Sequence, residues 1–113
     1  MNIQQLIPTV REKLQFTWEF HRFMPEISGC YVLTTFDGTV LYAGLTNNLK
    51  RRFGEHRDSD DKSGLTEQGR AFWFYYLPCA EVELNRTERS WLNQHITEHG
   101  ALPILNKMNS PVR

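Results

Sequence analysis

The sequence predicts an α/β fold in which helices flank a small three-stranded antiparallel sheet, with an extra helix at the N-terminus. Two β-rich stretches, residues 29–36 and 39–44, lie on either side of Asp37-Gly38, a dipeptide typical of tight hairpin turns. A third run, residues 71–77, is almost wholly aromatic and apolar, which favours a strand that is buried on both faces. The segments before and after these strands show apolar residues at helical spacing.

The N-terminal helix is expected over residues 5–24, in a chain that forms one domain. The apolar side chains of this segment recur at roughly helical spacing, at Leu6, Val10, Leu14 and Trp18. We expect residues 1–28 to be a helical extension packed on the main domain, residues 29–113. A chain of 113 residues suits a single domain with a modest core.

A two-residue turn between the first two strands would fix their register. It pairs Tyr31 with Gly44 and Leu33 with Tyr42. Because side chains alternate between the faces of a strand, Tyr31 and Tyr42 then share one face, at diagonal positions that aromatic side chains can bridge. Leu33 and Val40 are expected on the same face, and Gly44 leaves open space above the Tyr31 ring. The pattern alone also fits two strand aromatics that pack a core.

The segment after this hairpin predicts a basic helix. Asn47 or Thr46 can cap it, and it is expected to run to about Arg57. Arg52 and His56 are four residues apart and therefore neighbours on one helix face. Arg52 can offer a planar fork of donors to a phosphate, and His56 can move a proton or bind a phosphate oxygen. A solvated basic helix face is the competing explanation for this pair.

A polar loop and a second long helix complete the chain. Residues 58–70 are expected to be a mobile loop, and residues 85–99 a helix that stops at Gly100. Glu88 lies in or beside the apolar stripe of this helix, so its carboxylate needs a partner. A divalent metal ion is one candidate. A capping box with Asn85 is the other, and the residues alone slightly favour it.

Composition and charge restrict the possible functions. Hydrophobic residues make up 40% and charged residues 23%, as in ordinary globular proteins. The formal net charge is +0, so we expect only weak, salt-sensitive nucleic-acid binding if the domain acts alone. The sequence shows neither a bilayer-spanning apolar run nor a signal-peptide pattern, which predicts a cytoplasmic protein without a membrane partner. Reduced thiols at Cys30 and Cys79 are expected in that setting.

Two tyrosine-bearing strands followed by an arginine-bearing helix form a motif. It reads Gly29-Cys30-Tyr31, then Tyr42-Ala43-Gly44, with an arginine eight residues past that glycine. This resembles the signature of the GIY-YIG nuclease superfamily, here as a stand-alone single-domain member, and the resemblance covers roughly residues 28–106. It implies two signature tyrosines, the signature arginine, a histidine one turn later, a glutamate and a closing asparagine. In that order these site residues are Tyr31, Tyr42, Arg52, His56, Glu88 and Asn106.

The resemblance implies a metal-dependent endonuclease that hydrolyses DNA phosphodiester bonds, one strand per site. One Mg²⁺ or Mn²⁺ ion would be held by Glu88, while Arg52 stabilises charge on the scissile phosphate. A hydroxyl of Tyr42 or Tyr31 would orient or deprotonate the attacking water, helped by a neighbour because the tyrosine reference pKa is near 10. DNA is then the partner, with a possible homodimer or a targeting protein beside it. The alternative is a catalytically silent module that keeps the fold and binds nucleic acid or protein.

Overall fold

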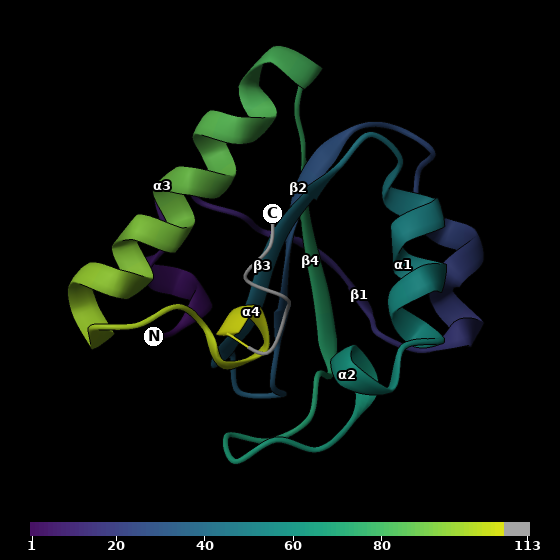
Figure 1. The fold of residues 1–113 in the computed structure, drawn as a ribbon. Helices are drawn as coiled ribbons and strands as arrows, with labels where there is room; N and C mark the ends of the chain where they lie inside the picture. The colour runs from purple at the N-terminus through teal and green to yellow at the C-terminus, as the bar shows by residue number, and fades with distance from the viewer. Residues whose placement is uncertain (108–113) are drawn as a thin grey trace.

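A four-stranded antiparallel sheet forms the centre of the molecule in the computed structural model, which describes residues 1–107 (Figure 1). The strand order across the sheet is β1-β4-β2-β3. Their bounds are β1 Glu12–Gln15, β2 Gly29–Thr34, β3 Val40–Thr46 and β4 Trp73–Pro78. The predicted α/β class and antiparallel pairing are confirmed, and the sheet has one strand more than predicted.

Helices cover both faces of this sheet. Within residues 1–107, the α-helices are α1 Leu49–Arg57, α2 Asp60–Ser63, α3 Glu81–His99 and α4 Ile104–Lys107, and the 3₁₀ helices are η1 Ile3–Gln5 and η2 Trp18–Phe23. In Figure 1, α3 lies on one side of the sheet and α1 on the other. Along the part of the chain that the structure describes, no helix is both long and apolar enough to cross a bilayer.

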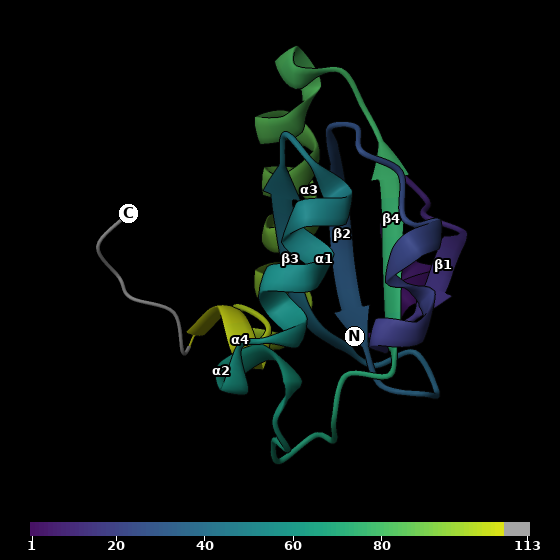
Figure 2. The ribbon, with the colours of Figure 1, turned by 90° about the vertical axis from the view of Figure 1, so that its right-hand side faces the viewer.

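The helix predicted for residues 5–24 is wrong. This segment instead contains β1, which pairs with β4 along the outer edge of the sheet, with Leu14 opposite Phe74 (Figure 2). Two physical reasons explain the difference. Pro8 disfavours a helix interior, and Leu14 and Phe16, two residues apart, both pack into the core on one face. The open edge of β4 supplies hydrogen-bond partners that local helical spacing cannot reveal.

The β2–β3 hairpin keeps the predicted register near the tyrosines, although its turn differs from the prediction. The loop has three residues rather than two: the Gly38 N–H donates to the Thr35 carbonyl and the Thr35 N–H to the Thr39 carbonyl, both at 3.0 Å. Gly38 has φ +94°, a left-handed conformation that suits glycine. The pairing then slips by one residue between Leu33 and Thr34, which leaves Leu41 as an extra residue in β3.

This bulge restores the predicted partners and moves one side chain to the other face. Tyr31 lies opposite Gly44 and Leu33 opposite Tyr42, as predicted. Val40 lies opposite Thr34, so the prediction that Val40 shares the tyrosine face is wrong. Val40 belongs to the apolar cluster on the other side of the sheet.

Each face of the sheet has its own core. The cluster below α1 includes Phe16, Tyr31, Leu33, Tyr42, Leu49, Phe53 and Phe74. The cluster below α3 includes Ile3, Val10, Cys30, Val32, Val40, Ala43, Leu84 and Trp91. A fully buried side chain of this size contributes roughly 1.5–3 kcal/mol, so both clusters hold their helices firmly against the sheet.

The ends of the other elements differ from the sequence prediction in detail. Asn48 caps α1 by accepting a hydrogen bond from the Arg51 N–H at 3.0 Å, in place of the expected Asn47 or Thr46. The segment predicted as a loop, residues 58–70, contains the short helix α2. The aromatic strand is buried on both faces only in part: Phe74 and Tyr75 are buried, whereas its last residues are half-buried or exposed.

Candidate active site

Three rings from three consecutive elements meet on the α1 side of the sheet. Tyr31 comes from β2, Tyr42 from β3 and His56 from the last turn of α1. The Tyr31 hydroxyl lies 2.7 Å from His56 Nε2. The ring centroids are 5.9 Å apart for the two tyrosines and 5.5 Å apart for Tyr42 and His56. The structure therefore brings together the predicted diagonal tyrosine pair and the predicted histidine.

Gly44 makes this close packing possible. A Cβ atom at position 44 would lie 2.7 Å from the Tyr31 hydroxyl oxygen and 2.9 Å from Cε2 of Tyr42. Both separations are too short for a real side chain. The space above Gly44 is therefore filled by Tyr31 itself, which corrects the expectation of an open space there.

Burial fixes the protonation states of the Tyr31–His56 pair. Tyr31 has no exposed surface, and this burial raises its pKa well above the ordinary tyrosine value, with a contribution from Tyr42. Burial, followed by the positive charges of Lys62 and Arg52, lowers the pKa of His56 to about 3. At neutral pH the pair is therefore a phenol and a neutral imidazole joined by a hydrogen bond.

Arg52 lies beside this pair on α1. Burial opposes its charge, but Tyr31 and Glu55 more than offset that effect and raise the pKa of the guanidinium. Its Nε lies 2.8 Å from Glu55 Oε1, yet the buried Nε–H has no well-aligned hydrogen bond among the described residues. About 31% of the side chain is exposed, so the guanidinium can reach an anion from solvent.

Lys62 is a site cation that sequence reasoning missed. It lies in α2, and only 7% of the residue is exposed. Its Nζ stands 4.8 Å from the centroid of the Tyr42 ring, within the range of a cation–π contact. The polar residues around Lys62 in the sequence suggested a mobile loop, and no local pattern indicated that this lysine is buried.

Glu88 comes from the other side of the sheet. It is half-buried in the interior of α3, which begins at Glu81. The capping-box explanation is therefore wrong, because Asn85 is itself inside the helix. Glu88 lies close enough to Cys30 for its charge to be among the causes, after burial and Cys79, that raise the pKa of the Cys30 thiol.

The donor set fits a metal held mainly by water and substrate. Within residues 1–107, no group of three or more His, Cys, Asp and Glu side chains is placed to hold a metal ion. A single carboxylate such as Glu88 is nevertheless enough for Mg²⁺, which keeps several waters and typically binds one or two carboxylates plus phosphate oxygens.

Asn106 fixes the C-terminal helix to the edge strand. Its Oδ1 accepts from the Ala43 N–H and its Nδ2 donates to the Ala43 carbonyl, each at 2.9 Å. Ala43 directly follows Tyr42 in β3. Asn106 thus satisfies both backbone groups of one edge-strand residue next to the tyrosine cluster, and α4 lies against β3 (Figure 1).

The family model described as the GIY-YIG catalytic domain matches residues 27–100. The chain belongs to the GIY-YIG family. The matched residues include the tyrosines, Arg52, His56 and Glu88 of the site described above, whereas Asn106 lies beyond them.

Two curated relatives are named UvrABC system protein C. The chain is 31% identical over 83 residues to the protein of Methanosarcina barkeri and 28% identical over 82 residues to that of Methanosarcina acetivorans. Each match covers 70% of this chain but only 16% of the relative. The matched region therefore corresponds to a small part of these longer proteins.

The buried neutral His56 makes stability depend on pH. As the pH falls below 6.5, the ordinary histidine pKa, His56 becomes protonated in the unfolded chain. In the folded protein it stays neutral down to about pH 3. The free energy of unfolding should therefore decrease by about 1.4 kcal/mol for each pH unit by which the pH is lowered between these limits. Urea unfolding from pH 7 to pH 4.5 measures this slope. His56→Gln should remove the His56 contribution and leave that of His95, whose pKa is also lowered by burial. His99→Gln, at an exposed site, should leave the slope unchanged, and equal slopes for all three proteins would refute the assignment.

The contacts of Asn106 predict a loss of stability when its side chain is shortened to alanine. Asn106→Ala removes two hydrogen bonds to Ala43 and should lower the free energy of unfolding by about 1–3 kcal/mol. Asn93→Ala, at an exposed position of α3, is the matched control and should change it by less than about 0.5 kcal/mol. Chemical denaturation provides the comparison, and indistinguishable midpoints would contradict the role given to Asn106.

Proposed function

We propose that this GIY-YIG domain is a metal-dependent endonuclease that hydrolyses DNA phosphodiester bonds, cutting one strand per site. The carrying observation is the Tyr31–His56–Tyr42 cluster with Arg52 beside it, in a chain that belongs to a catalytic-domain family. Phenol, guanidinium and ammonium groups at one partly buried place suit a phosphodiester better than a neutral substrate.

Arg52 and Lys62 supply the positive charge for the scissile phosphate. Arg52 has a buried Nε–H without an aligned acceptor, so turning toward a phosphate oxygen would satisfy it. Lys62 lies over the Tyr42 ring and brings a second cation to the same place. Their charges act where negative charge grows on the phosphoryl oxygens during attack.

Tyr42 is the better of the two tyrosines for orienting water. Tyr31 is fully buried and its hydroxyl is engaged by His56, whereas Tyr42 keeps 7% of its surface exposed. In our proposal the Tyr42 hydroxyl accepts a hydrogen bond from the attacking water. A bond then forms between the water oxygen and phosphorus while the bond to the leaving sugar oxygen breaks. The water gives a proton to the Tyr42 oxygen, Tyr42 releases its own proton to solvent, and the leaving oxygen takes a proton from solvent.

His56 and Tyr31 hold Tyr42 in position rather than exchange protons with substrate. A histidine whose pKa is about 3 is not protonated at neutral pH and cannot be the general acid there. Glu88 would hold Mg²⁺ or Mn²⁺, which supplies Lewis-acid stabilisation of the phosphate and of the leaving oxygen. A single site cuts one strand, so double-strand cleavage would need two protomers, as in a homodimer, or two binding events, whereas a targeting partner would bring the domain to its DNA.

A plasmid-nicking assay with Mg²⁺ and Mn²⁺ tests the endonuclease. Wild-type protein should nick supercoiled DNA, and Arg52→Ala and Glu88→Ala should each lower kcat by roughly 100-fold or more. Arg51→Ala and Glu81→Ala, at exposed positions on the same helices, are matched controls and should keep most of the activity. Tyr42→Phe should reduce kcat more than Tyr31→Phe.

The same experiment distinguishes the enzyme from the catalytically silent module. DNA binding without metal-dependent nicking by the wild-type protein would favour that module and reject the enzyme. Nicking that survives both Arg52→Ala and Glu88→Ala would reject the site instead. A Mn²⁺ titration followed by paramagnetic line broadening reports metal binding independently of activity, and Glu88→Ala should weaken it.

Lys62 makes a prediction that combines electrostatics and catalysis. Lys62→Met keeps the apolar length of the side chain but removes a charge that helps to lower the pKa of His56. The pKa of His56, followed by NMR titration, should rise while the nicking rate falls about tenfold or more. Arg70→Met also removes one charge, from an exposed position, and should change neither quantity. An unchanged His56 titration in Lys62→Met would contradict the contact.

A further inference from the structure

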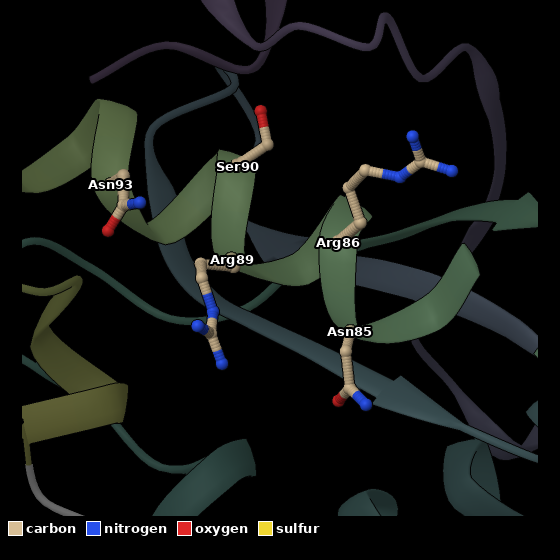
Figure 3. A pocket seen from close by; sticks show the side chains of 5 residues that line it. All are labelled: Asn85, Arg86, Arg89, Ser90 and Asn93. Atoms are coloured by element: carbon tan, nitrogen blue, oxygen red, sulfur yellow. The ribbon is translucent and has the colours of Figure 1, made fainter. Parts of the chain in front are cut away.

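The outer face of α3 carries a polar row that the site described above does not use. Asn85, Arg89 and Asn93 follow one another at intervals of four residues, and all three are exposed. Together with Arg86 and Ser90 they line a hollow of about 500 Å³ (Figure 3). All five lining side chains are polar or positively charged, so this hollow does not suit an apolar ligand.

The two arginines of this hollow are in different situations. Arg86 forms an ion pair with Glu83, and it also lines a second hollow beside Ile7 and Pro8. For Arg89, the described residues provide neither an ion pair nor a hydrogen bond. Figure 3 shows Asn85 and Arg89 pointing to one side of α3 and Arg86 and Ser90 pointing to the other.

Asn85 lies between Glu88 and Arg89 on the surface of α3, and Arg89 is exposed whereas Glu88 is half-buried. Asn85 is three residues from Glu88 and four from Arg89, so its side chain neighbours each of them on the helix surface. A DNA strand whose scissile phosphate meets Glu88 therefore has its next phosphates within reach of this part of α3. The arginine fork and the amide N–H groups are donors suited to phosphate oxygens.

We propose that Arg89, assisted by Asn85, binds a backbone phosphate of the DNA strand next to the cut. This inference rests on the proposed function, and it adds a substrate-positioning surface on α3. A phosphate contact of this kind fixes the position of the strand without reading its sequence. In a chain of formal net charge +0, each such contact forms a large share of the total affinity.

Salt-dependent binding of a short fluorescent DNA duplex tests the proposal, with Arg86→Ala as the matched control for Arg89→Ala. Both substitutions remove one arginine from an exposed position of the same helix. Anisotropy titrations in Ca²⁺ at several salt concentrations give the slope of log K against log[salt]. Arg89→Ala should reduce this slope by about 0.9, the loss of one phosphate contact, and weaken binding about tenfold. Arg89→Lys should keep the slope, and Arg86→Ala should behave as wild type.

Steady-state nicking separates this inference from the proposed function. Arg89→Ala should raise KM several-fold and leave kcat unchanged, because the contact lies away from the reacting phosphate. If the wild-type protein is active and Arg86→Ala and Arg89→Ala change KM equally, only the role of Arg89 is overturned. A fall in kcat at constant KM in Arg89→Ala would overturn that role as well. A wild-type protein that neither binds nor nicks DNA would instead remove the proposed function itself. Circular dichroism of each variant confirms that α3 is intact.

Discussion

The hydrogen bond between the Tyr31 hydroxyl and His56 is the contact on which the site depends. It joins the first strand of the hairpin to the last turn of α1 at 2.7 Å, inside a core where Tyr31 has no exposed surface. Burial keeps the phenol protonated and the imidazole neutral, so each satisfies the other without a net charge. Tyr42 then stands at a fixed distance from both rings, and Arg52 is held beside them on the same helix.

The local sequence was enough to predict this cluster because its members are close along the chain. Strand alternation and helical spacing place Tyr31, Tyr42, Arg52 and His56 without any long-range information. The register survived a wrong turn prediction for a physical reason. The extra loop residue shifts the pairing by one, and the bulge at Leu41 shifts it back before the tyrosines. The wrong loop length and the missed bulge therefore cancel each other at the positions of the two tyrosines.

Predictions that depended on tertiary context failed. The N-terminal segment shows helical spacing, yet its strand forms because β4 offers an unpaired edge, which no local pattern encodes. The sequence around Asn85 is typical of a helix cap, but α3 begins one turn earlier, at Glu81. Lys62 lies in a polar run typical of loops, and only the tertiary structure reveals that it is buried with its ammonium group over the Tyr42 ring.

The position of β3 explains how groups from both faces could serve one substrate. Tyr42 faces the α1 side, whereas α3 carries Glu88 and packs on the other side. Since β3 is an edge strand, the path between these faces runs around a single strand rather than through the sheet. Asn106 satisfies the free backbone groups of Ala43 on that edge, which discourages strand pairing by another protein. A phosphodiester that contacts both Tyr42 and Glu88 must therefore cross the free edge of β3. It would then have α1 on one side and Arg89 of α3 on the other.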